Sequence, residues 1–170
     1  TTYGVLLDEA GKRGEGVLAL GDPDYGQLDA TAVTVFRGAG GLAPLPGTRE
    51  EAKTVGDVVL LGEDATEAGL LEAVAKCPRW RAVHLACHGL VDPERPLLSS
   101  LALSRAGDDD GFLTALEVLR MQVPADLAVL SACETGTGKL VGGEGILGLT
   151  RAFMYAGTPR VVCSLWKVDD

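Results

Sequence analysis

Continuous apolar runs alternate along this chain with segments that carry helix start signals, and this alternation is the strongest constraint on its fold. We expect strands at residues 17–21, 58–61, 82–87, 127–132 and 160–168. Strands that are apolar throughout are buried on both faces, and parallel strands need a crossover connection, usually a helix. The chain is therefore predicted to fold as one α/β domain with a mostly parallel sheet and helices on both faces.

Two capping boxes mark helix starts, because a Thr side chain can cap the backbone N–H of a Glu three residues later. One box pairs Thr48 with Glu51 and the other pairs Thr114 with Glu117. Gly157 is placed to end the last helix. The helices are expected at residues 48–56, 66–75, 114–123 and 143–156, with one more short strand at 101–103.

Composition excludes several classes of protein. With 46% apolar residues and a net charge of −9, the chain can bury a core and lacks the basic stripe of a nucleic-acid or anionic-membrane binder. The sequence shows neither a membrane-spanning apolar run nor a signal segment. Its four cysteines form no CxxC pair, which favours reduced thiols in a cytoplasmic compartment. The domain is expected to fill residues 1–170, and the initial Thr suggests a piece of a longer protein.

Three of the predicted strands end in residues that can do chemistry. His88 and Gly89 follow the strand at 82–87, Cys133 follows 127–132, and Asp169 with Asp170 follows 160–168. In an open parallel sheet, ligands bind outside the carboxyl ends of the strands. Neighbouring strands lie only about 4.8 Å apart. If these strands are adjacent, a thiol, an imidazole and a carboxylate meet at one edge.

A cysteine beside a histidine is the usual arrangement for activating a sulfur nucleophile, because the thiolate is the reactive form. The backbone N–H groups of Gly89 and Cys133 could then bind an oxyanion. Each residue also has a simpler interpretation: Cys133 as a buried small hydrophobe, His88-Gly89 as a turn, and Asp169 as a solvated residue or helix cap. The spacing alone leaves these alternatives open.

Two other patterns resemble sites but fail on their chemistry. Residues 133–140 follow a strand like a phosphate-binding P-loop, yet Cys133 stands where Gly is needed and Leu140 where Ser or Thr is needed. His84 and His88 have the spacing of a helical metal site, but on a strand they would lie about 13 Å apart. We expect His84 to be a buried strand residue and expect no metal.

Several ordered motifs resemble the CHAT domain, a caspase-like module that is often found with tetratricopeptide repeats and is related to separase. The similarity extends from about Leu45 to the last residue. The motifs are His84-Leu-Ala-Cys-His88-Gly89, Leu130-Ser-Ala-Cys133-Glu-Thr-Gly136, Gly143-Glu-Gly145, Leu149-Thr-Arg-Ala-Phe-Met-Tyr-Ala-Gly157 and Ser164-Leu-Trp-Lys-Val-Asp169.

The resemblance implies a cysteine endopeptidase of the caspase/hemoglobinase fold without a cofactor. It implies His88 as the catalytic histidine, Cys133 as the nucleophile, and Gly89 with Cys133 as oxyanion-hole donors. Asp169 falls where separase-like members keep a pocket carboxylate that favours cleavage after a basic residue, and Trp166 is a candidate wall of that pocket. Cys87 departs from the family, which more often has a small or hydroxyl residue there.

The family continues past residue 170 with more helix and strand, so we expect the C-terminal part of the fold to be missing from this chain. A C-terminal segment or second chain is the expected partner, together with a protein substrate and a tetratricopeptide-repeat regulatory region. No nucleic acid or membrane is expected to bind directly. The alternative function is a catalytically silent caspase-like module that binds other proteins.

Overall fold

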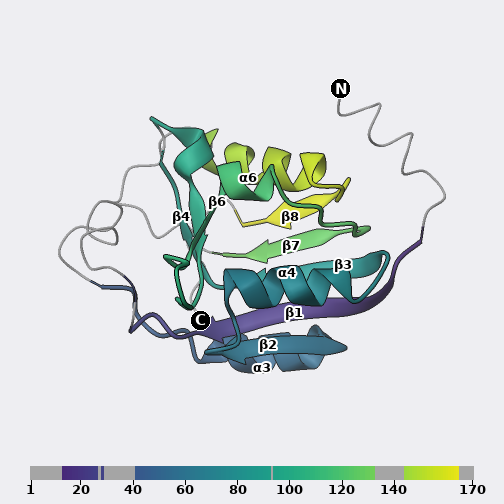
Figure 1. Ribbon diagram of the computed structural model, residues 1–170, viewed down its shortest axis with the longest axis horizontal. Coiled ribbons are helices and arrows are strands. Elements are labelled where there is room, and N and C mark those ends of the chain that lie inside the picture. The colour runs from purple at the N-terminus through teal and green to yellow at the C-terminus, as the bar shows by residue number, and fades with distance from the viewer. Residues whose placement is uncertain (1–12, 27, 29–40, 93, 133–143, 165–170) are drawn as a thin grey trace.

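A parallel five-stranded sheet forms the centre of the computed structural model, which describes residues 13–26, 28, 41–92, 94–132 and 144–164 (Figure 1). The strand order is β2-β1-β3-β7-β8, and all four neighbouring pairs are parallel. The strands are β1 (Glu15–Pro23), β2 (Val58–Gly62), β3 (Trp80–Ala86), β7 (Ala128–Ser131) and β8 (Val161–Cys163). The predicted α/β class with a mostly parallel sheet is confirmed.

Helices cover both faces of this sheet. The helices are α3 (Gly47–Val55), α4 (Glu67–Ala75), α5 (Ala115–Val118) and α6 (Glu144–Tyr155), with a short 3-10 turn, η1, at Pro96–Leu98. The step from β1 to β2 runs in the opposite direction across the sheet from every later step. Because such crossovers are right-handed, α3 lies on one face and the other helices on the opposite face, as Figure 1 shows for α4 and α6.

Small residues on one face of β1 let α3 approach the sheet closely. Leu18 and Leu20 point into the main core, whereas Ala19 and Gly21 alternate with them and face α3. A Cβ atom on Gly21 would lie 2.4 Å from the carbonyl oxygen of Thr48. The tight contact therefore requires glycine, and it holds α3 over the middle of the sheet.

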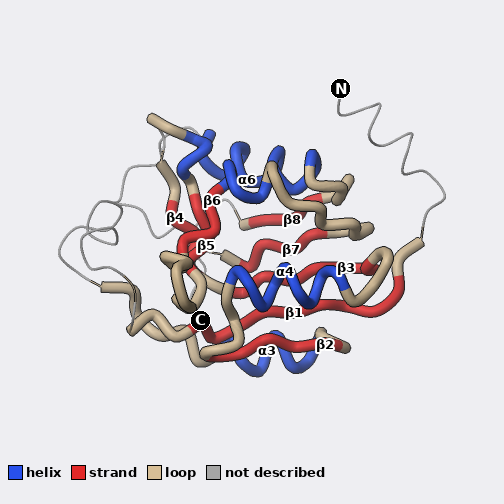
Figure 2. Tube along the Cα trace, viewed as in Figure 1, coloured by secondary structure: helices blue, strands red, loops and turns tan. Residues whose placement is uncertain are grey.

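A second, antiparallel sheet stands at the carboxyl edge of the first (Figure 2). It consists of β4 (His88–Leu90), β5 (Ser100–Ala102) and β6 (Phe112–Thr114), in that order. Only its middle strand was expected from the sequence. β3 ends at Ala86, and His88 begins β4 after one intervening residue rather than occupying a simple turn.

The helix signals had mixed outcomes. Thr114 and Glu117 form the predicted capping box, although α5 ends sooner than expected, at Val118. The box at Thr48 is wrong: α3 begins at Gly47 with Pro46 as its N-cap. The Thr48 hydroxyl instead donates to the Leu45 carbonyl and accepts from the Asp22 N–H, which joins the start of α3 to the end of β1.

Across the residues that the structure describes, we find no helix with the length and apolar character needed to cross a lipid bilayer.

Candidate active site

The strands that lead to the predicted site residues are neighbours in the sheet. β7 lies between β3 and β8, with Ala86 opposite Ser131 and Leu130 opposite Cys163. The backbone N–H of Cys87 still donates to the Ser131 carbonyl beyond the end of β3, at 3.3 Å. The adjacency on which the sequence argument depended is therefore present. Cys133, Trp166 and Asp169 themselves lie outside the described residues.

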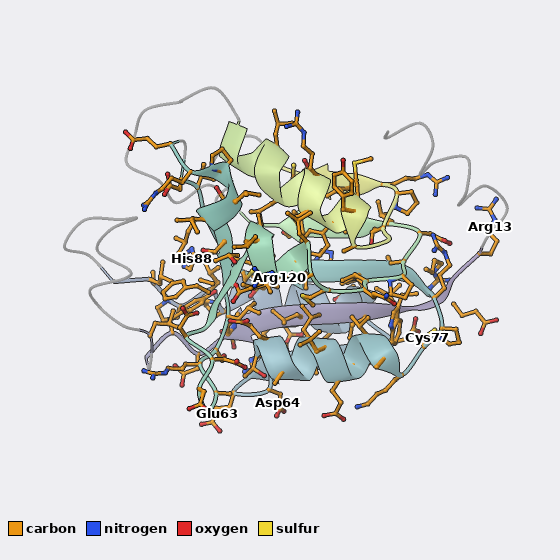
Figure 3. The ribbon with its side chains drawn as sticks, turned by 45° about the horizontal axis from the view of Figure 1, so that its top comes forward. Arg13, Glu63, Asp64, Cys77, His88 and Arg120 are labelled. Carbon is orange, nitrogen blue, oxygen red and sulfur yellow. The ribbon has the colours of Figure 1, made fainter. Side chains whose placement is uncertain are left out.

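His88 is buried at this edge, with 4% of its surface exposed (Figure 3). Its Nε2 atom lies 2.7 Å from the carbonyl oxygen of Ala43, in the connection between β1 and α3. A carbonyl oxygen can only accept, so Nε2 carries the hydrogen of this bond. In the neutral ring, Nδ1 is then the nitrogen that can take up a proton.

Tyr25 contacts both the backbone and the ring of His88. Its hydroxyl oxygen accepts from the His88 N–H at 3.3 Å. The two ring centroids are 5.1 Å apart and the planes are tilted by 49°. The histidine is therefore held from two sides by the chain that follows β1.

Gly89 pairs with Leu101 in the small sheet. It also lines a small cavity together with residues at the end of β7. This cavity, of about 10 Å³, is lined by Gly89, Ala132, Cys163, Ser164 and several apolar side chains. The residue after His88 and the residue before Cys133 thus face the same small space. The oxyanion hole formed by Gly89 and Cys133 stays a prediction.

His84 is a buried strand residue, as predicted, with 8% of its surface exposed. Its Nε2 atom lies 2.9 Å from a carboxylate oxygen of Glu51 on α3. Glu51, expected to complete a capping box, serves this histidine instead. Within the described ranges, no group of three or more His, Cys, Asp or Glu side chains is arranged to hold a metal ion.

The three described cysteines, Cys77, Cys87 and Cys163, are free thiols. Cys87 is 1% exposed, and burial raises the pKa of its thiol to about 12. Burial also raises the pKa of Cys163. Cys77 lies at the far end of the sheet, where its Sγ is 3.0 Å from the Arg79 carbonyl oxygen. A thiol that stays protonated is a poor nucleophile. Cys87 and Cys163 are therefore unsuited to the role predicted for Cys133, and Cys77 lies at the other end of the strands.

A depression of about 790 Å³ lies at the opposite edge of the sheet. Arg13, Arg79 and Arg120 line it, beside the ends of the helices. Arg79 is bound there to Asp126, with its Nε 2.6 Å from the carboxylate. This depression is remote from His88, and the arginine nearest the strands already has a carboxylate partner.

Sequence reasoning missed Ala43 and Tyr25. Ala43 acts through a backbone carbonyl, which every residue possesses, so its identity gives no signal. Tyr25 lies two residues after Pro23, where β1 ends. A tyrosine directly after a strand end, at the edge that carries the histidine, is the signal that could have found it.

The comparison with protein families decides the classification. A model of the CHAT domain matches residues 5–170. The chain belongs to the CHAT domain family. Its parallel sheet, covered by helices on both faces, agrees with the caspase-like fold, and the expected family is confirmed.

Two relatives are tetratricopeptide repeat proteins. Human tetratricopeptide repeat protein 28 is 30% identical over an alignment covering 74% of this chain, and the mouse protein of the same name is 39% identical over 34% of it. The matches span 6% and 2% of those proteins. This CHAT domain therefore corresponds to a small part of much longer relatives.

Proposed function

We propose that this CHAT domain is a cysteine endopeptidase that cleaves proteins through a dyad of Cys133 and His88. The observation that carries the proposal is the position of His88. It is buried at the carboxyl edge of the parallel sheet, with Nε2 bound to the Ala43 carbonyl, beside the strand that leads to Cys133. The chain also belongs to the CHAT domain family, which is caspase-like, and this membership supports the same reaction.

The reaction follows from the roles of these groups. Nδ1 of His88 accepts the proton of the Cys133 thiol, and the thiolate attacks the carbonyl carbon of the scissile peptide bond. The N–H groups of Gly89 and Cys133 stabilise the negative oxygen of the tetrahedral intermediate. The imidazolium then protonates the leaving amine, and an acyl-enzyme forms. His88 next takes a proton from water, which attacks the thioester and releases the acid with the free thiol.

The substrate class proposed for this site is a protein segment with a basic residue before the cut. Asp169 supplies the carboxylate that a buried guanidinium requires, since an unpaired buried charge is very costly. Arg suits such a pocket better than Lys because its planar fork binds a carboxylate in two places. Trp166 forms a wall of this pocket.

We place the domain in a cytoplasmic protein in which other segments control it. The tetratricopeptide repeat relatives support a repeat region as regulator. A C-terminal segment or second chain beyond β8 would complete the sheet and the substrate groove, and proteolytic processing or partner binding would switch on cleavage.

The test is labelling of the complete protein with a peptide that carries Arg at the cut site and an electrophilic group. Covalent attachment to Cys133 in the wild type, and its loss in Cys133→Ala and His88→Ala, is the expected result. Attachment to Cys77 or Cys163 instead would show that the nucleophile is misassigned. A folded wild-type protein that stays unlabelled with and without its regulatory region would favour the silent interaction module.

A further inference from the structure

Tyr25, in the connection after β1, contacts His88 and is not part of the proposed dyad. Tyr25 binds the His88 N–H through its hydroxyl oxygen and packs its ring against the imidazole at 5.1 Å. Both contacts act on the same residue, one on its backbone and one on its side chain. The tilted arrangement at this separation is a favourable geometry for two aromatic rings.

Tyr25 is itself held in place by a hydrogen-bonded turn. The Asp24 N–H donates to the Ser104 hydroxyl at 2.7 Å, and the Asp24 carboxylate accepts from the Gly26 N–H at 2.9 Å. The Ser104 hydroxyl in turn donates to the Gly62 carbonyl at the end of β2. Ser104 thus joins the ends of β1 and β2 at the position that carries Tyr25.

A small apolar core fixes the other side of this turn. Leu90, Ala102 and Phe112 of the antiparallel sheet are buried together, and Tyr25 packs against them with Leu28 and Leu42. The tyrosine therefore bridges this core and His88. A side chain anchored in this way can hold a catalytic group in one orientation.

We infer that Tyr25 is a positioning residue that sets the orientation of His88 toward Cys133 and stabilises the protonated imidazole. The negative face of an aromatic ring attracts a neighbouring cation. With Nε2–H directed at the Ala43 carbonyl, the ring contact fixes the orientation of Nδ1, the nitrogen that the proposed mechanism uses. The inference rests on the proposed function of His88 and assigns Tyr25 no contact with the substrate.

The test compares Tyr25→Ala and Tyr25→Phe in the complete protein. Tyr155→Ala is the matched control, because Tyr155 is 72% exposed at the end of α6. Three quantities are measured: the rate of Cys133 alkylation by iodoacetamide, kcat and KM for an Arg peptide, and the ¹⁵N signals of the His88 ring. Thermal unfolding shows that each variant is folded.

Tyr25→Ala should slow alkylation and lower kcat about tenfold while KM changes less than about twofold, since misplacing a catalytic group mainly affects the transition state. Its ring signals should shift from one fixed tautomer toward a mixture. Tyr25→Phe keeps the ring contact and should recover most of the rate, and Tyr155→Ala should match the wild type.

An unchanged His88 signal and alkylation rate in folded Tyr25→Ala would overturn the inference, as would an effect on KM alone. Failure of the proposed function gives a different pattern: the wild type neither cleaves nor shows His88-dependent alkylation of Cys133. In that case the ¹⁵N signals still report whether Tyr25 orients the ring.

Discussion

The two histidines of the chain occupy two different regions of one continuous segment, the middle of β3 and the edge just beyond it. His84 faces α3 and binds the carboxylate of Glu51. His88 lies past the strand end, where the carbonyl of Ala43 and the ring of Tyr25 hold it. The partner of His84 comes from a helix packed on the sheet, whereas the partners of His88 come from the connection after β1.

This difference agrees with the structural role of His84 and with the catalytic role that we propose for His88. The Nε2 atom of His84 lies 2.9 Å from the Glu51 carboxylate, a contact that joins β3 to α3. The Nε2 atom of His88 lies 2.7 Å from a backbone carbonyl, and both the neutral and the protonated imidazole can donate this hydrogen bond. A histidine that exchanges protons during a reaction needs the second environment.

Replacing each histidine by alanine should give the largest contrast between the regions. His88→Ala in the complete protein should lower kcat/KM by about 10³ or more, because a general base is lost. His84→Ala should keep activity within a few-fold and lower the free energy of unfolding by roughly 1–3 kcal/mol, since it removes a buried hydrogen bond. Peptidase assays and denaturant unfolding of both variants measure this. Equal losses of activity in His84→Ala and His88→Ala, with equal stability of the two variants, would show that the two histidines do not differ in role.

The thiols offer the next contrast, between Cys133 and Cys87. The pKa of Cys87 is raised to about 12 by burial, so its thiolate is scarce at neutral pH. Iodoacetamide should modify Cys133 at least about 100-fold faster than Cys87. Mass spectrometry of timed reactions gives both rates, and Cys87→Ala should leave activity nearly unchanged. Faster modification of Cys87 would mean that the reactive thiol is the one between β3 and β4, and that Cys133 is misassigned.

Substitution of Asp169 tests whether substrate selectivity, like the proposed dyad, depends on the carboxyl edge of the sheet. Asp169→Ala should lower kcat/KM for Arg substrates by about 10–100-fold, the effect of leaving a substrate charge unpaired. Asp64→Ala is the matched control, because this exposed carboxylate follows the end of β2. A peptide library with varied residues before the cut measures selectivity. A wild-type preference for Leu or Asp would refute the pocket and leave the dyad intact.

The smallest effect is expected where α4 meets the loop before β6, on the face of the sheet opposite α3. Burial, followed by repulsion from Glu117, Asp109 and Asp110, raises the pKa of Glu67 to about 7. The folded state therefore holds this proton more tightly than the unfolded state. The resulting stability is complete below the ordinary value of 4.5 and is lost as the pH rises through about 7.

Glu67→Gln should flatten this pH dependence by about 1 kcal/mol, a value reduced for solvent screening. Thermal unfolding between the two pH values provides the measurement. A slope equal to that of the wild type would assign the pH dependence to other groups.

The parts of the fold that sequence could predict are those with a strong local signal. Continuous apolar runs located the strands, and residues at their ends indicated His88. The small sheet was largely missed, because three-residue strands such as β4 carry too little pattern. The box at Thr48 failed because its hydroxyl instead accepts from the Asp22 N–H and donates to the Leu45 carbonyl. The positions of Cys133 and Asp169 stay predictions.

The pairing of β1 along both of its edges has a consequence for synthesis on the ribosome. β1 pairs with β2 on one side and with β3 on the other, and β3 begins only at Trp80. At roughly 5–20 residues per second, one side of β1 waits several seconds for its partner. The pairing of β3 with β7 comes later still. The sheet edge beside His88 is therefore completed only after the chain has passed through states with unpaired strand edges.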